Sequence, residues 1–161
     1  MLEIGFGCGH HVQGRSAIAW NKFFENDLQY YAIDYIAPEN FVNYKGPTCL
    51  SSFNEKYPGY LKKIFWGSQA NTTLLNEIVK EMPKKWDIIV DDGSHDYSHI
   101  ITSFEYLWPH VVDGGLYVIE DLQNNDRKFH NCECYINILK LNKIKNNFML
   151  LVTLYLKDLQ R

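Results

Sequence analysis

The segment Trp86–Asp91, with the sequence WDIIVD, constrains the fold of this chain more than any other feature. Its centre, Ile88-Ile89-Val90, is a continuous apolar run, which is typical of a strand buried on both faces of a parallel sheet. Parallel neighbours cannot be joined by a tight turn, so each must be reached through a crossover connection, usually a helix. The chain around this segment should therefore alternate between strands and helices.

Segments of both kinds do alternate along the sequence. We predict further strands at 2–4, 30–34, 63–66, 116–119 and 148–156, helices at 16–24, 72–82, 96–108 and 135–145, and a loop at 44–60, where prolines and glycines gather. This order predicts one α/β domain over residues 1–161, with a Rossmann-like, doubly wound, mostly parallel sheet and helices on both faces. In such sheets, ligands bind outside the carboxyl ends of the strands.

The first candidate site is the glycine-rich turn after the first strand. Gly5, Gly7 and Gly9 follow Glu3 in a GxGxG spacing, and Asp34 closes the next strand. Glycines let the backbone approach a cofactor closely, and a carboxylate at Asp34 can accept hydrogen bonds from both hydroxyls of a ribose. The spacing differs from the GxGxxG of dinucleotide folds, which argues weakly against NAD. A structural turn without a ligand is the alternative interpretation.

Two pairs of acidic residues form the second candidate site. Asp91 and Asp92 lie at the end of one predicted strand, and Glu120 and Asp121 follow the next one. If these strands are neighbours, their ends lie roughly 5 Å apart, so the carboxylates converge and repel one another unless a cation neutralises them. All-oxygen ligation favours a hard ion such as Mg²⁺ over zinc. Ordinary solvated loop acids are the alternative, and we favour a metal or substrate site.

Histidines next to these acids are candidates for proton transfer. His95 lies three residues after Asp92, and the ordinary pKa of a histidine near neutrality suits a general base. His99 lies one helical turn further, but no third ligand at helical spacing supports zinc, so we interpret His99 as structural. The segment 130–134 also lacks the spacing of a zinc site.

Composition excludes several classes of partner. The formal net charge is −3, and the acidic excess lies in residues 1–122, so a nucleic acid partner is not expected. The longest apolar run, 148–156, is too short to span a membrane, and no signal-peptide pattern follows Met1. Because the four cysteines (Cys8, Cys49, Cys132 and Cys134) contain no CxxC pair, we expect reduced thiols and a cytoplasmic location.

The residues of both candidate sites resemble those of a known family. Residues 2–9 are similar to motif I of class I S-adenosylmethionine-dependent methyltransferases. The segment 91–122, DDGSHDYSHIITSFEYLWPHVVDGGLYVIEDL, is more specific. It resembles the metal-dependent sugar O-methyltransferases of macrolide and rhamnosyl-polyketide biosynthesis, the mycinamicin and tetracenomycin type. The resemblance extends from the first predicted strand to the fifth.

This resemblance implies an activity and a role for each residue. The implied reaction is the Mg²⁺-assisted methylation of a hydroxyl on a sugar or glycosylated small metabolite, with S-adenosylmethionine as methyl donor. Asp92, Glu120 and Asp121 would bind Mg²⁺, and His95 would be the base. The glycine turn would hold the methionine part of the cofactor, Asp34 its ribose, and Gln69 would lie by the adenine. The full set of expected cofactor-binding residues is Glu3, Gly5, Gly7, Gly9, Asp34, Gln69 and Asp91.

Some features depart from the family pattern. The chain begins inside the first strand, Ser68 and Asn71 stand where the family usually has acids, and one candidate strand remains where a hairpin is expected. We therefore expect a chain that is truncated at both ends. These residues do not decide between a monomer and a homo-oligomer. An inactive or truncated module that binds the cofactor or a partner is the main alternative. A metal-dependent catechol-type O-methyltransferase is a second, and a nicotinamide-dependent oxidoreductase is the least favoured.

Overall fold

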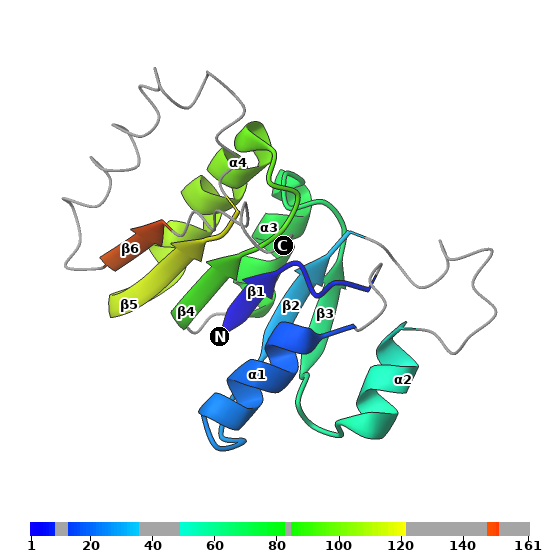
Figure 1. The fold of residues 1–161 in the computed structure, drawn as a ribbon. Helices are drawn as coiled ribbons and strands as arrows, with labels where there is room; N and C mark the ends of the chain where they lie inside the picture. Colours follow the sequence, from blue (N-terminus) through cyan, green and yellow to red (C-terminus); the bar gives the residue numbers. More distant parts are fainter. Residues whose placement is uncertain (9–12, 36–48, 83–84, 122–147, 152–161) are drawn as a thin grey trace, which may run out of the picture.

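Residues 1–8, 13–35, 49–82, 85–121 and 148–151 are described by a computed structural model. They form a parallel sheet of six strands in the order β3-β2-β1-β4-β5-β6 (Figure 1). The strands are β1 (Leu2–Ile4), β2 (Tyr31–Asp34), β3 (Lys63–Trp66), β4 (Trp86–Asp91), β5 (Val111–Ile119) and β6 (Phe148–Leu151). Because β4 pairs with both β1 and β5, it is an interior strand, as its apolar sequence predicts.

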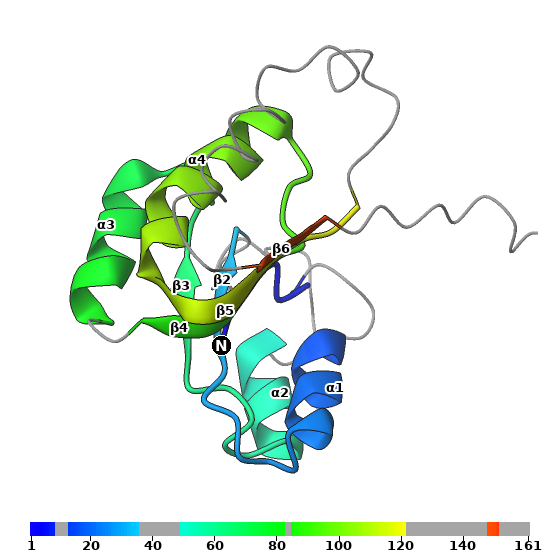
Figure 2. The same ribbon diagram turned by 90° about the vertical axis from the view of Figure 1, so that its left-hand side faces the viewer.

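Helices cover both faces of the sheet, which confirms the doubly wound α/β prediction. The helices α1 (Arg15–Phe23) and α2 (Cys49–Lys56) lie on one face, and α3 (Thr72–Glu81) and α4 (Tyr97–Leu107) lie on the other (Figure 2). Each face has its own buried apolar cluster. Adjacent β4 residues contribute to opposite clusters: Ile89 packs with the α3 and α4 side, and Val90 with the α1 and α2 side.

The register of the strands places one row of residues at the carboxyl edge of the sheet. Ile4 is paired with Ile33 and Asp91, and Asp91 is paired with Ile119. The hydrogen-bond ladder continues for one more residue: the amides of Gly5, Asp92 and Glu120 donate to the carbonyls of Ile33, Ile4 and Asp91 at 2.8, 2.9 and 2.9 Å. The residues that follow the strands therefore start from fixed backbone positions.

Two predicted elements were wrong. Within the predicted loop 44–60, residues 49–56 form the helix α2, because Cys49 and Phe53 lie one turn apart and are both buried. The second correction concerns β5, which was predicted at 116–119 but begins at Val111. Gly115 permits a close approach there, since an added Cβ would lie 2.8 Å from the carbonyl oxygen of Asp87.

The remaining predicted elements agree with the structure to within about two residues. The predicted helix 135–145 and the predicted strand residues 152–156 lie outside the described residues. None of the helices described here combines the length and apolar character needed to cross a membrane.

We predict that the N-cap of α3 contributes measurably to stability. The side-chain oxygen of Asn71 accepts hydrogen bonds from the amides of Thr73 and Leu74 at 3.0 and 3.2 Å. Asn71→Ala should lower the free energy of unfolding by about 1 kcal/mol, measured by urea denaturation. The exposed Glu77 in the same helix provides a control, because Glu77→Ala should change stability by less than about 0.5 kcal/mol. Equal effects of the two substitutions would contradict the capping role.

Candidate cofactor and metal site

A cavity of about 800 Å³ lies at the carboxyl ends of β1 to β4. Gly5 and Gly7 line it from the turn after β1, Asp34 from the end of β2, Gln69 from the loop after β3, and Asp92 from the end of β4. The structure thus brings four of the predicted cofactor-binding residues to one cavity. Gly9, also predicted to bind the cofactor, lies outside the described residues.

Gly5 is required by the close contact between the turn after β1 and the loop after β4. Its φ is +100°, and an added Cβ would lie 2.1 Å from the carbonyl oxygen of Asp92. A side chain at this position would meet both a backbone strain and a steric clash. The glycine turn and the first predicted metal ligand are therefore packed directly against each other.

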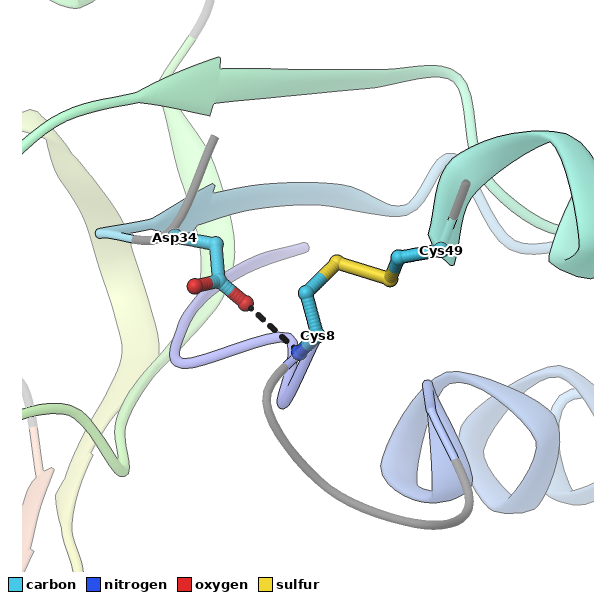
Figure 3. The surroundings of a disulfide bond; sticks show 3 residues. All are labelled: Cys8, Asp34 and Cys49. Carbon is cyan, nitrogen blue, oxygen red and sulfur yellow. Dashed lines mark hydrogen bonds between the residues drawn. A yellow bond between two sulfur atoms is a disulfide. The ribbon is translucent and has the colours of Figure 1, made fainter. Parts of the chain in front are cut away.

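Asp34 is held by the glycine turn itself (Figure 3). The backbone amide of Cys8 donates a hydrogen bond of 3.1 Å to Oδ2 of Asp34, whose side chain is almost buried. Cys8 is in turn joined by a disulfide to Cys49, the first residue of α2. The disulfide thus links the turn that contacts Asp34 to a helix 41 residues later in the sequence.

The prediction of reduced thiols is therefore wrong for Cys8 and Cys49. Sequence spacing was a poor guide, because the pair is formed by the fold: α2 begins beside the turn after β1, with the two Cα atoms 5.5 Å apart. Cys132 and Cys134 lie outside the described residues.

Glu3 was predicted to bind the cofactor, but it does not line the cavity. Its side chain is 1% exposed, and its Oε2 accepts a hydrogen bond of 2.6 Å from the hydroxyl of Tyr30. Burial raises the pKa of Glu3 to about 7, against the opposing effect of hydrogen bonds from Ser16 and Tyr30. Glu3 is therefore an interior residue that links β1 to Tyr30, just before β2, and to Ser16 in α1.

Asp91 is also an interior residue and does not line the cavity. Its carboxylate accepts hydrogen bonds from Nε2 of Gln69 at 2.9 and 3.0 Å and from the hydroxyl of Ser103 at 2.6 Å. Burial raises its pKa to about 6, and these hydrogen bonds act in the opposite direction. The two adjacent acids of the DDGSH segment thus point to different environments: Asp91 to the interior and Asp92 to the cavity.

Asp92, His95 and Asp121 form a cluster that can hold a metal ion. One ligand atom from each lies within 4.8 Å of the others, and all three residues are partly exposed. Nε2 of His95 lies 3.8 Å from Oδ1 of Asp92. His95 and Asp121 adopt the left-handed backbone region, with φ of 56° and 48°, which is uncommon for residues other than glycine and frequent at functional sites.

Glu120 lies beside this cluster. Its pKa is raised by burial and then by the negative charges of Asp92 and Asp121. Two carboxylates and an imidazole, with a third carboxylate nearby, are a donor set that suits a divalent cation, and such an ion would relieve their mutual repulsion. Two of the predicted metal ligands, Asp92 and Asp121, are thus close to each other. The same geometry leaves two roles open for His95, a metal ligand and a base.

Other cavity residues were missed by the sequence analysis. Arg15 and Ser16, at the start of α1, and Tyr35, after β2, line the cavity. His99, which we interpreted as structural, also lines it, and its Nδ1 lies 3.0 Å from the hydroxyl of Ser94. Arg15 and Ser16 could have been found from their position, because the helix that follows a glycine-rich turn starts at the ligand site of such folds.

We predict that Glu3 makes stability depend on pH. The pKa of Glu3 in the folded protein, about 7, lies above its ordinary value of 4.5. Its contribution to the free energy of unfolding is therefore complete below pH 4.5 and is lost as the pH rises through 7. The free energy of unfolding of Glu3→Gln should lack this decrease, which amounts to at most about 3 kcal/mol. Urea denaturation between pH 4.5 and 8 measures it, with the exposed Glu77→Gln as control. Parallel pH profiles of Glu3→Gln and the unaltered chain would contradict the prediction.

We also predict that the disulfide stabilises the fold. Cys49→Ser should lower the free energy of unfolding by about 2–4 kcal/mol under oxidising conditions. The matched control is the same pair of proteins in dithiothreitol, where the unaltered chain should become about as unstable as Cys49→Ser. A stability difference that persists unchanged in dithiothreitol would show that the serine acts through packing alone.

The sequence of the chain is similar to the sequences of several curated enzymes. Demethylmacrocin O-methyltransferase of Streptomyces fradiae is 36% identical over 124 residues, which are 76% of this chain and 27% of that protein. Mycinamicin VI 2''-O-methyltransferase of Micromonospora griseorubida is 34% identical over the same shares of the two chains. L-olivosyl-oleandolide 3-O-methyltransferase of Streptomyces antibioticus is 51% identical over 123 residues, or 75% of this chain and 27% of that protein. No family model matches the sequence.

Solved structures give the same grouping. The MycE methyltransferase from the mycinamycin biosynthetic pathway, in complex with Mg, SAH and mycinamycin VI, superposes with a TM-score of 0.64. It is 28% identical, and the match covers 89% of this chain and 37% of that one. A putative short-chain alcohol dehydrogenase from Burkholderia multivorans reaches a TM-score of 0.59 at 14% identity, over 94% of this chain and 80% of that one. This second likeness concerns the fold alone.

The chain spans about a quarter of the length of the curated relatives, as the 27% coverage shows. Within that quarter, the chain is similar to these enzymes in sequence and to the MycE methyltransferase in fold. The chain is therefore homologous to the sugar O-methyltransferases of macrolide and tetracenomycin pathways, as the resemblance in its sequence predicted.

Proposed function

We propose that this chain forms the cofactor and metal centre of an S-adenosylmethionine-dependent, Mg²⁺-assisted O-methyltransferase. The observation that carries the proposal is the arrangement at the carboxyl edge of the sheet. A cavity lined by Gly5, Gly7 and Asp34 lies directly beside the cluster of Asp92, His95 and Asp121. A methyl donor in the cavity and an acceptor at the cluster would then be neighbours, which is the condition for a direct transfer between them.

The cavity offers the groups that a nucleoside cofactor needs. The carboxylate of Asp34 is the candidate acceptor for the ribose hydroxyls, and the Cys8 amide that donates to it fixes its orientation. The glycine turn lets a ligand approach the backbone after β1 closely. Arg15, which also lines the cavity, provides a positive charge for a carboxylate of the ligand.

The acidic cluster would act on the acceptor hydroxyl. Bound Mg²⁺ would lower the pKa of a hydroxyl that it coordinates, and S-adenosylmethionine would supply the methyl group. Asp92, Asp121 and the nearby Glu120 are the proposed ligands. His95, 3.8 Å from Asp92, is the proposed base that takes the proton of the hydroxyl.

A sugar hydroxyl on a small glycosylated metabolite is the proposed acceptor, because the names of the relatives describe such reactions. The acidic excess of residues 1–122 makes a nucleic acid an unsuitable partner. Attachment to a membrane forms no part of the proposed function, and a homo-oligomer is compatible with it.

The cytoplasmic location predicted from the cysteines is a separate proposal, and the Cys8–Cys49 disulfide argues against it. Disulfides persist mainly in oxidising compartments. Thiol labelling of the protein in the cells that make it distinguishes the two cases. Free Cys8 and Cys49 would favour the cytoplasm, whereas their protection from the label would favour an oxidising compartment.

Calorimetry with S-adenosylhomocysteine tests the proposed function first. We expect the unaltered chain to bind S-adenosylhomocysteine and, separately, Mg²⁺. Asp34→Asn should weaken the nucleoside and leave Mg²⁺ binding nearly unchanged, whereas Asp92→Asn should do the reverse. Binding of S-adenosylhomocysteine without any binding of Mg²⁺ would favour an inactive cofactor-binding module, and binding of neither would contradict the proposal.

Replacement of His95 distinguishes the two roles that the cluster allows it. If His95 is the base, His95→Ala should lower turnover by about 10²- to 10⁴-fold and leave the affinities for Mg²⁺ and S-adenosylhomocysteine nearly unchanged. Turnover is measured with a panel of glycosylated and catechol acceptors, which also separates the sugar enzyme from the catechol type. A large loss of Mg²⁺ affinity would instead make His95 a ligand, and full activity of His95→Ala would exclude both roles.

A further inference from the structure

Gln69 connects two parts of the site that are far apart in the sheet. It lies in the loop after β3, whereas the proposed metal-binding segment, residues 92–95, follows β4. The strands β2 and β1 lie between β3 and β4. The side chain of Gln69 nevertheless extends across the carboxyl edge of the sheet and contacts the loop after β4. It is buried there, with 5% of its surface exposed.

The amide of Gln69 holds the chain on both sides of Asp92. On one side, its Nε2 donates to both carboxylate oxygens of Asp91, at 2.9 and 3.0 Å. On the other side, its Oε1 accepts a hydrogen bond of 2.7 Å from the backbone amide of Ser94. Asp92 therefore lies between two residues that one side chain fixes, and His95 is the next residue after Ser94.

Gly93 leaves no room for a side chain of its own beside Gln69. An added Cβ on Gly93 would lie 2.0 Å from Oε1 of Gln69 and 2.9 Å from Cγ2 of Ile4. Gly93 thus allows the amide to contact the backbone of the metal-binding segment. A primary amide offers a donor to a carboxylate and an acceptor to an N–H group in one planar unit. A carboxylate at this position would repel Asp91. An apolar side chain would remove the hydrogen bonds to Asp91 and from the amide of Ser94.

We propose that Gln69 is a positioning residue that holds segment 92–95 in place, so that Asp92 and His95 face Asp121 before a cation binds. This role rests on the proposed function, and it differs from the adenine contact that the family resemblance implied for Gln69. Residues that orient metal ligands through hydrogen bonds typically contribute about 10- to 100-fold to metal affinity or activity.

Gln69→Met tests the role against Ser103→Ala as a matched control. Methionine is similar to glutamine in length but makes no hydrogen bond to Ser94. Ser103→Ala removes a different hydrogen bond to the same buried Asp91, together with a 3.3 Å hydrogen bond from Nε2 of Gln69, but it leaves the Gln69–Ser94 contact intact. Both variants lose one partner of Asp91, so both should be less stable. Only Gln69→Met should affect the metal-binding segment.

Two measurements on the full chain follow from this difference, and a third variant is read by both. Calorimetry should show that Gln69→Met weakens Mg²⁺ binding by about 10- to 100-fold, whereas Ser103→Ala stays close to the unaltered chain. Amide hydrogen exchange of the metal-free proteins should be faster at Ser94 in Gln69→Met only. Gly93→Ala, which displaces Oε1 of Gln69, should shift both quantities in the same direction as Gln69→Met.

Unchanged Mg²⁺ affinity in Gln69→Met, or an equal loss in Ser103→Ala, would overturn the positioning role while leaving the proposed function intact. Absence of Mg²⁺ binding in the unaltered chain would contradict the proposed function instead. The hydrogen exchange of Ser94 in the unaltered, metal-free chain needs no variant. Slow exchange is expected there, and rapid exchange would contradict the hold of Gln69 on this segment.

Discussion

The site depends on the parallel pairing of β4 with β1 on one side and β5 on the other. This pairing puts Asp91 opposite Ile4 and Ile119, and the backbone ladder then fixes the next residue of each strand. Gly5, Asp92 and Glu120 consequently start from one row at the carboxyl edge of the sheet. A register shift by one residue would turn Asp92 inward and Asp91 outward, because neighbouring residues of a strand face opposite sides.

Glu3 and Asp91, which the sequence analysis predicted to bind the cofactor, are buried inside the protein. Glu3 accepts a hydrogen bond from Tyr30, and Asp91 accepts hydrogen bonds from Gln69 and Ser103, all inside the protein. Buried carboxylates are costly unless their hydrogen bonds are satisfied. The raised pKa values of Glu3 and Asp91 reflect that cost. The partly exposed and the buried acids thus lie in separate environments: Asp92 and Asp121 are the proposed metal ligands, whereas Glu3 and Asp91 accept hydrogen bonds inside the protein.

The Cys8–Cys49 disulfide lies next to Asp34, which lines the cavity. It anchors the end of the glycine turn to α2, and the same Cys8 provides the amide that orients Asp34. Two kinds of constraint therefore flank the cavity: a covalent bond near the proposed ribose position, and the hydrogen bonds of Gln69 near the proposed metal position. Both reduce the conformational freedom of loops that would otherwise have to order when ligands bind.

The sequence by itself determined the α/β class and most of the elements, and it pointed to the two candidate groups of residues at the strand ends, because apolar periodicity, glycines and acids at strand ends are local signals. It mistook α2 for a loop, since prolines and glycines near Cys49 outweighed the single buried turn of Cys49 and Phe53. The order of the strands in the sheet decided which distant residues meet at the site. Only the folded chain shows that Cys8 meets Cys49, that Gln69 reaches Ser94, and that Asp91 faces inward, because each contact joins residues whose separation in the sequence carries no information about their distance.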